Sequence, residues 1–304
     1  MKKLTMGTVA LALAAGAAAQ AQTESMHCGS CAEWNQPRAP FKVYGNTYYV
    51  GTAGLSALLV TSPQGHILLD GALPQSAPLI EKNIAALGFR IRDVKLIVNS
   101  HAHFDHAGGI PALQRASGAV VAASPASAQG MKLGNNIESD PQFTPRGDFS
   151  FPKTKDVKVV ADGETLSVGP LKLTAHFTPG HTPGGTTWSW RSCENGKCAD
   201  VVYAESLTGI SADDFHFTGD ARHPDISASM QASIDKVGKL PCDIVISTHP
   251  SFTGTFEKLA AKKGKLNPFL SPGGCRAYAD AAARSFQQRL DKERREKAAP
   301  AAAR

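Results

Sequence analysis

The stretch Asn99-Ser100-His101-Ala102-His103-Phe104-Asp105-His106 places four residues of metal-binding type within six consecutive positions. It directly follows the apolar segment 94–98, which has the composition of a strand buried on both faces. His101 and His103 are two positions apart, so in an extended chain their side chains point in the same direction. Because a histidine cluster beside a buried strand is costly unless it is bound or paired, this stretch predicts a metal site.

Further ligands are expected at two other strand ends. The loop 178–185 follows a predicted strand and surrounds one histidine with two prolines and three glycines, which indicates a side chain held in a fixed position. A late histidine follows the predicted strand 244–247. Three imidazoles suit a tetrahedral zinc with an open fourth position, which is typical of catalytic sites, although iron and manganese remain alternatives. The expected first set is His101, His103 and His181, and the expected second set is Asp105, His106 and His249.

Short apolar strands and amphipathic helices alternate through the chain in two halves that meet near residue 165. Two sheets packed face to face, with helices on both outer sides, would bury all these apolar faces. The expected strands are 48–50, 57–61, 66–69, 94–98, 119–122, 157–160, 171–177, 186–190, 201–204 and 244–247, and the expected helices are 76–87, 110–116, 226–237 and 276–297.

The first 21 residues have the pattern of a secretory signal peptide. Lys2 and Lys3 precede the short apolar run 4–15, and Ala19-Gln20-Ala21 is an A-x-A cleavage pattern, so we expect cleavage near Ala19 or Ala21. The run is too short to span a membrane well. The sequence therefore predicts a protein that is exported to the periplasm and is free of the membrane once the signal is removed.

The net charge of +6 is concentrated at the two ends of the chain. Residues 1–21 contribute +2 and residues 284–304 contribute +4, so the predicted domain 22–283 is formally neutral. The basic tail 284–304 mixes acids with bases, which is typical of a solvated helix face that frays at its end, rather than of a nucleic-acid-binding segment. Neither a nucleic acid nor a membrane is therefore expected as a partner.

All six cysteines lie after the predicted signal, which in an exported chain favours disulfides. Cys193 and Cys198 flank an Asn-Gly turn and are expected to pair across it. Cys242 and Cys275 would then close a long loop. Cys28 and Cys31 form a C-x-x-C pair, for which we expect a local disulfide, while a redox motif is the alternative.

The chain resembles the metallo-β-lactamase superfamily over most of residues 35–275. The resemblance rests on Leu69-Asp70-Gly71, the H-x-H-x-D-H motif at 101–106, the Gly-His pair ending at His181, and His249. It implies an α/β fold of the αββα type, a four-layer sandwich. Its two central sheets would be mostly antiparallel, with helices on the outer faces and a dinuclear zinc site at one edge.

Within that superfamily the chain is similar to the β-lactamases of subclass B3. The similar segments are 45–51, 73–77 and 203–206. Ser206 occupies a position where another subclass has cysteine, and Glu205 stands where the family commonly has aspartate.

The resemblance implies a hydrolase that opens the β-lactam ring of penicillins, cephalosporins and carbapenems and so confers antibiotic resistance. Two Zn²⁺ ions per chain would supply a metal-bound hydroxide, which Asp105 would orient. Ser206 and Thr208 would bind the substrate carboxylate, and Asp70 and Ser100 would orient the metal ligands. We expect a monomer that acts on a small molecule.

Another exported hydrolase of the superfamily, acting on a lactone, a thioester or a phosphodiester, is the closest alternative. Such relatives often use an aspartate that bridges the metals, and Asp220 is the residue that would have to serve. An iron-dependent oxygenase and a zinc-binding protein without turnover are further alternatives. Preference among β-lactam classes depends on the loops 45–56 and 205–225.

Overall fold

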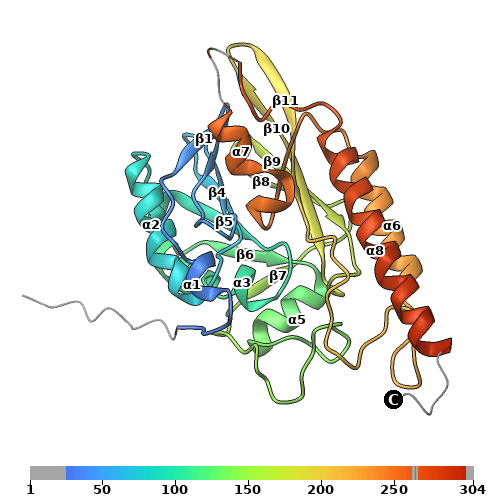
Figure 1. Cartoon of the computed structure of the whole chain (residues 1–304). Helices are drawn as coiled ribbons and strands as arrows, with labels where there is room; N and C mark the ends of the chain where they lie inside the picture. Colours follow the sequence, from blue (N-terminus) through green and yellow to red (C-terminus); the bar gives the residue numbers. More distant parts are fainter. Residues whose placement is uncertain (1–24, 262–263, 265, 299–304) are drawn as a thin grey trace, which may run out of the picture.

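Two β-sheets form the centre of the computed structural model, which describes residues 25–261, 264 and 266–298 (Figure 1). The segment expected to be a signal peptide lies outside the described residues. The first sheet has the order β1-β2-β3-β4-β5-β6-β7 and the second has the order β12-β11-β10-β9-β8. The strands are β1 (Phe41–Tyr44), β2 (Thr47–Tyr49), β3 (Leu58–Val60), β4 (His66–Leu69), β5 (Val94–Val98), β6 (Val120–Ala123), β7 (Val157–Val159), β8 (Thr165–Val168), β9 (Leu171–Phe177), β10 (Thr186–Glu194), β11 (Lys197–Ala204) and β12 (Ile244–Ser247).

Both sheets mix parallel and antiparallel pairs. The first sheet is antiparallel from β1 to β4 and parallel from β4 to β7, whereas the second is antiparallel except where β11 pairs with β12. The strand β5 lies between two parallel neighbours, and four of its five residues are buried. Its carboxyl end therefore projects from the middle of the sheet, and the histidine-rich stretch begins there.

Helices cover the outer faces of both sheets (Figure 1). On the first sheet, α2, α4 and α5 pack apolar side chains against one face, while α6 and α8 lie side by side on the second sheet. The helices are α1 (Cys31–Trp34), α2 (Ala77–Ala86), α3 (Phe104–Ala107), α4 (Ile110–Ser117), α5 (Pro125–Leu133), α6 (Ser227–Lys239), α7 (Thr255–Ala260) and α8 (Gly274–Ala298), with short 3-10 turns at Pro74–Ser76, Ile91–Asp93 and Pro250–Thr253.

Three separate apolar cores hold these layers together. Neighbouring residues of one strand enter different cores because strand side chains alternate: Leu68 faces the helices, whereas Leu69 faces the second sheet. The core between the sheets includes the fully buried Trp188 and Tyr203. Helix, sheet, sheet and helix therefore follow one another, which confirms the predicted four-layer αββα sandwich.

Helix α8 confirms the helix expected over residues 276–297, although it is less exposed than the charged composition suggested, and the fraying expected at its end lies outside the described residues. Helix α8 continues to Ala298, and it buries Phe286, Leu290 and Glu293. Phe286 and Leu290 are one helical turn apart and pack into the outer core beside α6, because residues four apart share a helix face. Charged residues outnumber the apolar ones in this segment, so its composition alone did not indicate the narrow apolar stripe on one face of the helix.

Three disulfides join the cysteines in the predicted pairs, Cys28–Cys31, Cys193–Cys198 and Cys242–Cys275. Asn195 and Gly196 are the two central residues of the β10–β11 hairpin turn, and both adopt positive φ angles, 52° and 76°. None of the described helices is long and apolar enough to cross a membrane.

Candidate metal centre

Three segments that are distant in sequence meet at one edge of the two sheets. His101 and His103 lie in the turn after β5, and Asp105 and His106 lie on the short helix α3. The loop after β9 contributes one further histidine, and the end of β12 contributes another. The structure thus brings together all six predicted ligands, His101, His103, His181, Asp105, His106 and His249.

The first predicted set forms a compact cluster. One ligand atom each of His101, His103 and His181 lies within 4.8 Å of the other two, and all three side chains are buried. The ring centroids of His101 and His103 are 4.7 Å apart, and each ring is 5.0 Å from that of His181. This spacing allows three imidazole nitrogens to face one ion.

The second predicted set is centred on a carboxylate. Oδ2 of Asp105 lies 3.2 Å from Nε2 of His106 and 3.4 Å from Nε2 of His249. His101 connects the two sets, because it also forms a cluster with Asp105 and His106, and its ring is 4.3 Å from that of His106. The two groups that could hold a metal ion thus share His101 and lie side by side.

Hydrogen bonds at the opposite ring atoms decide which nitrogen of each histidine faces the site. Nδ1 of His101 lies 2.9 Å from Oε2 of Glu205, while its Nε2 is buried without a hydrogen-bond partner among the described residues. Nε2 of His103 is bonded to Asp140 at 3.1–3.2 Å, which leaves Nδ1 for the ion. A metal would satisfy the orphaned Nε2 of His101, so the donor set fits the group that the sequence predicts.

Two of the remaining three histidines, His181 and His249, follow the same rule. Nδ1 of His181 is bonded to the carbonyl oxygen of Thr208 at 3.1 Å, and Nδ1 of His249 donates to the carbonyl oxygen of Gly54 at 3.2 Å. Both residues therefore present Nε2. The ring of His249 also packs against that of Trp34, with the centroids 5.2 Å apart, which restricts its rotation.

Burial keeps the imidazoles of His101 and His181 neutral. It lowers the pKa of His101 well below the ordinary value, and it lowers that of His181 to about 3, with neighbouring histidines adding to both effects. Burial alone would raise the pKa of Asp105, but His106 and His249 outweigh it and hold that pKa well below its usual range. Neutral imidazoles and an ionised carboxylate are the protonation states that zinc requires of its ligands.

The predicted orienting pair Asp70 and Ser100 lies directly behind the site. The carboxylate of Asp70 accepts bonds from the Ser100 amide and hydroxyl at 2.7 and 2.6 Å and from the Tyr203 hydroxyl at 2.8 Å. Its Oδ2 is 3.7 Å from Nδ1 of His106. Asp70 is fully buried and has a φ of 59°, an unusual backbone conformation that is typical of functional sites.

The predicted substrate-binding pair lies beside the ligands. The hydroxyl of Ser206 is bonded to that of Thr248 at 2.7 Å, next to His249, and the residue is only 1% exposed. The hydroxyl of Thr208 lies 2.9 Å from Nδ1 of His181. Both hydroxyls therefore support the segments that carry metal ligands.

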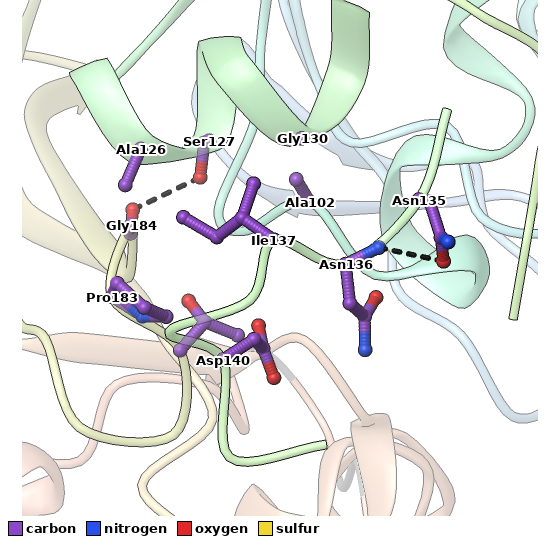
Figure 2. A pocket seen from close by; sticks show the side chains of 11 residues that line it. Ala102, Ala126, Ser127, Gly130, Asn135, Asn136, Ile137, Asp140, Pro183 and Gly184 are labelled. Carbon is purple, nitrogen blue, oxygen red and sulfur yellow. Dashed lines mark hydrogen bonds between the residues drawn. The ribbon is translucent and has the colours of Figure 1, made fainter. Parts of the chain in front are cut away.

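Asp140 and Glu205 are the functional residues that sequence reasoning missed. Asp140 lies in a long polar stretch without periodicity, so its bond to His103 had no local signal. Glu205 is visible in the sequence only as a departure from the family pattern. Figure 2 shows Asp140 on the wall of a cavity beside α5. That cavity, about 10 Å³, has room for roughly one water molecule and none for a substrate.

Asp220 lies on a surface loop and pairs with two histidines outside the cluster. Its Oδ2 is 2.9 Å from Nδ1 of His223 and 3.5 Å from Nδ1 of His216. It contributes to neither of the metal-type groups found among the described residues.

A family model of the metallo-β-lactamase superfamily matches residues 51–249, well over half of the chain, so the chain belongs to that superfamily and is a hydrolase of it. Its structural neighbours are subclass B3 metallo-β-lactamases. The Rm3 metallo-β-lactamase is 49% identical with a TM-score of 0.85, and the comparison covers 88% of this chain and 99% of that one. MEM-A1, a subclass B3 metallo-β-lactamase from a soil metagenome library, is 46% identical with a TM-score of 0.83, covering 86% and 99%.

The curated relatives include hydrolases of other substrates. The N-acyl homoserine lactonase AttM of Agrobacterium fabrum is 30% identical over 159 residues, which cover 41% of this chain and 55% of the lactonase. The chain matches between about two fifths and two thirds of the length of these curated relatives.

Proposed function

We propose that this protein hydrolyses the β-lactam ring of antibiotics with two zinc ions per chain, and thereby confers resistance. The observation that carries the proposal is the cluster of six predicted ligands at the edge of the fold. The neighbours of this fold, 46–49% identical and covered over 99% of their length, are named metallo-β-lactamases. The first ion would be held by His101, His103 and His181, and the second by Asp105, His106 and His249.

Zinc, when bound, activates water for attack and polarises the substrate carbonyl as a Lewis acid. The residues of the chain place the reactants. Asp105 carries a carboxylate that is ionised and held between His106 and His249, so it can orient the attacking water through Oδ2. Thr208 stands next to His181, where its hydroxyl can also donate to the carboxylate that β-lactam substrates carry. Ser206 would assist from the Thr248 side.

Hydrolysis adds one water molecule across the lactam C–N bond. The carbonyl carbon gains the oxygen and becomes a carboxylate, and the ring nitrogen leaves as an amine that takes up a proton. The chain needs no nucleophilic serine for this reaction, because the attacking oxygen comes from water. The small, neutral-bodied protein expected from the sequence would act as a monomer.

Three disulfides support the proposal that the protein works in the periplasm. Disulfides persist in oxidising compartments and are rare in the cytosol. The A-x-A pattern at Ala19–Ala21, which is typical of signal-peptide cleavage, supports export independently of the disulfides.

A lactone is the second candidate substrate, because AttM, one of the curated relatives, is a lactonase. Its identity and coverage are both lower than those of the B3 β-lactamases, which places the β-lactam first. Purified protein should be assayed in parallel on a penicillin, a cephalosporin, a carbapenem, an N-acyl homoserine lactone and an acyl thioester. The proposal expects kcat/KM to be at least a hundredfold higher for a β-lactam, and a lactone or thioester that leads the panel would overturn it.

A further inference from the structure

The loop between β11 and α6, residues 205–226, carries two supports of the metal ligands at its start. Glu205 is bonded to His101 at 2.9 Å, and Thr208 is bonded to His181 through both its carbonyl and its hydroxyl. Any displacement of this loop therefore changes the orientation of two imidazoles of the first set. What holds the loop in place matters to the site.

Helix α8 fastens that loop through one arginine. Nη2 of Arg289 donates to the hydroxyl of Ser211 at 2.7 Å and to the carbonyl oxygen of Phe215 at 3.0 Å. Nη1 of the same guanidinium donates to the carbonyl oxygen of Gly209 at 3.3 Å, one residue after Thr208. Only a planar fork of donors can reach three acceptors on different parts of one loop.

A buried carboxylate on the next helical turn adds to the attachment, as does Lys297, whose Nζ donates to the carbonyl oxygens of Thr218 and Gly219. Glu293, 1% exposed, accepts from the amides of Phe217 and Thr218 at 3.1 and 2.9 Å and from the Thr218 hydroxyl at 2.9 Å. Nε of Arg289 donates to its Oε1 at 2.6 Å, so the charges of the two residues compensate each other. Removing one of these partners would leave a buried charge uncompensated, which is strongly destabilising.

Close packing leaves the start of the loop little freedom. A Cβ atom added at Gly209 would lie 3.1 Å from the ring of Phe286 and 3.4 Å from Cγ of Arg289. Before Thr208, the Tyr278 hydroxyl of α8 donates to the carbonyl oxygen of Glu205 at 2.8 Å. Helix α8 thus holds the loop on both sides of Thr208.

From these contacts we propose that Arg289 and Glu293 are positioning residues for the first metal site. They act through Gly209 and Thr208 on His181, although they belong to the segment 284–304 whose composition is typical of a solvated helix face. The path is short: Arg289 to the Gly209 carbonyl, Thr208 to Nδ1 of His181, and His181 to the ion. The inference rests on the proposed function only for the identity of the ion and of the substrate.

The test uses the full-length protein with Arg289→Ala, Arg289→Lys and Glu293→Gln. Arg294→Ala is the matched control, because Arg294 lies on the same helix and, among the described residues, its guanidinium is hydrogen-bonded to Asp291 alone, at the exposed surface. Zinc affinity is measured by chelator competition on the folded fraction, and hydrogen exchange is followed in residues 205–219. Steady-state β-lactam hydrolysis is recorded alongside.

We expect about tenfold weaker zinc binding for Arg289→Ala and Glu293→Gln, faster exchange in 205–219, and a lower kcat. Arg289→Lys should recover only part of the affinity, because an ammonium lacks the fork geometry. The control should match the unaltered protein. Unchanged zinc affinity in Arg289→Ala, with only a smaller folded fraction, would overturn the inference. A chain that hydrolyses no β-lactam, yet loses zinc affinity in the variants, would overturn the proposed function and uphold this inference.

Discussion

Replacing Glu205 with glutamine tests how strongly the orienting bonds contribute to metal binding. Oε2 of Glu205 lies 2.9 Å from Nδ1 of His101, and both side chains are fully buried. Burial raises the pKa of Glu205 well above its ordinary value in the metal-free chain, whereas bound cations would favour the ionised carboxylate. Glutamine keeps the length and an acceptor oxygen but removes the charge that Glu205 would carry in the metal-loaded site. A charge-assisted hydrogen bond is worth about 1.5–3 kcal/mol and a neutral one about 1 kcal/mol, so the change costs roughly 1–2 kcal/mol of zinc-binding free energy. We therefore expect zinc affinity to fall about five- to thirtyfold.

The assay is competition for zinc with a chromophoric chelator at neutral pH. Glu194→Gln is the matched control, because Glu194 lies on β10 away from the site and, in the described part of the chain, forms an ion pair with Lys42 alone. That variant should bind zinc like the unaltered protein. If Glu205→Gln remains folded and its zinc affinity changes by less than twofold, the charge on Glu205 does not act through His101, and the reasoning fails.

Three further predictions concern stability and the surface loop. Cys242→Ser with Cys275→Ser opens a link of sequence separation 33, so the free energy of unfolding should fall by roughly 4 kcal/mol in urea titrations, and an unchanged midpoint would contradict the chain-entropy estimate. Burial favours a raised pKa for Glu293, but the amide bonds and the arginine outweigh it and lower that pKa below its ordinary 4.5. The stability that ionised Glu293 contributes is then fully present above pH 4.5 and is lost as the pH falls through the lowered pKa of the folded state. The unfolding free energies of the metal-free protein and of Glu293→Gln should therefore converge on acidification. A difference that stays constant with pH would refute this. Asp220→Asn should leave the zinc content unchanged, and loss of one zinc would favour a bridging role for Asp220.

Local patterns predict most of the strands and helices and the clustering of the candidate ligands, and the family resemblance adds the four-layer arrangement. Apolar strands end in histidine-rich turns, so His101 and His103 are recognisable from their spacing alone. Asp140 has no such signal: it lies 37 positions from His103, and only the folded chain brings them together. Glu293 likewise has no local signal: its neighbours in sequence are typical of a solvated helix face, and only the folded chain brings the amides of 217 and 218 to its carboxylate.

Packing between distant elements is a second reason why sequence patterns are insufficient, as helix α8 and the strand directions show. In α8 the apolar residues Phe286 and Leu290 are outnumbered by charged neighbours, so composition favoured solvent exposure, whereas the outer core beside α6 favours burial. Strand direction likewise depends on the connections rather than on the strands themselves. Parallel pairing of β4, β5 and β6 follows from the helices that connect them, and apolar periodicity alone carries no information about it.

Zinc titration of the metal-free protein tests the central claim most directly. Chelator-treated protein is supplied with zinc in steps, and carbapenem hydrolysis and bound zinc per chain are measured on the same samples. The account predicts no hydrolysis without metal, activity that returns with added zinc, and saturation at two bound ions per chain. Hydrolysis that survives removal of the metal, or full zinc loading without hydrolysis of any β-lactam, would contradict it.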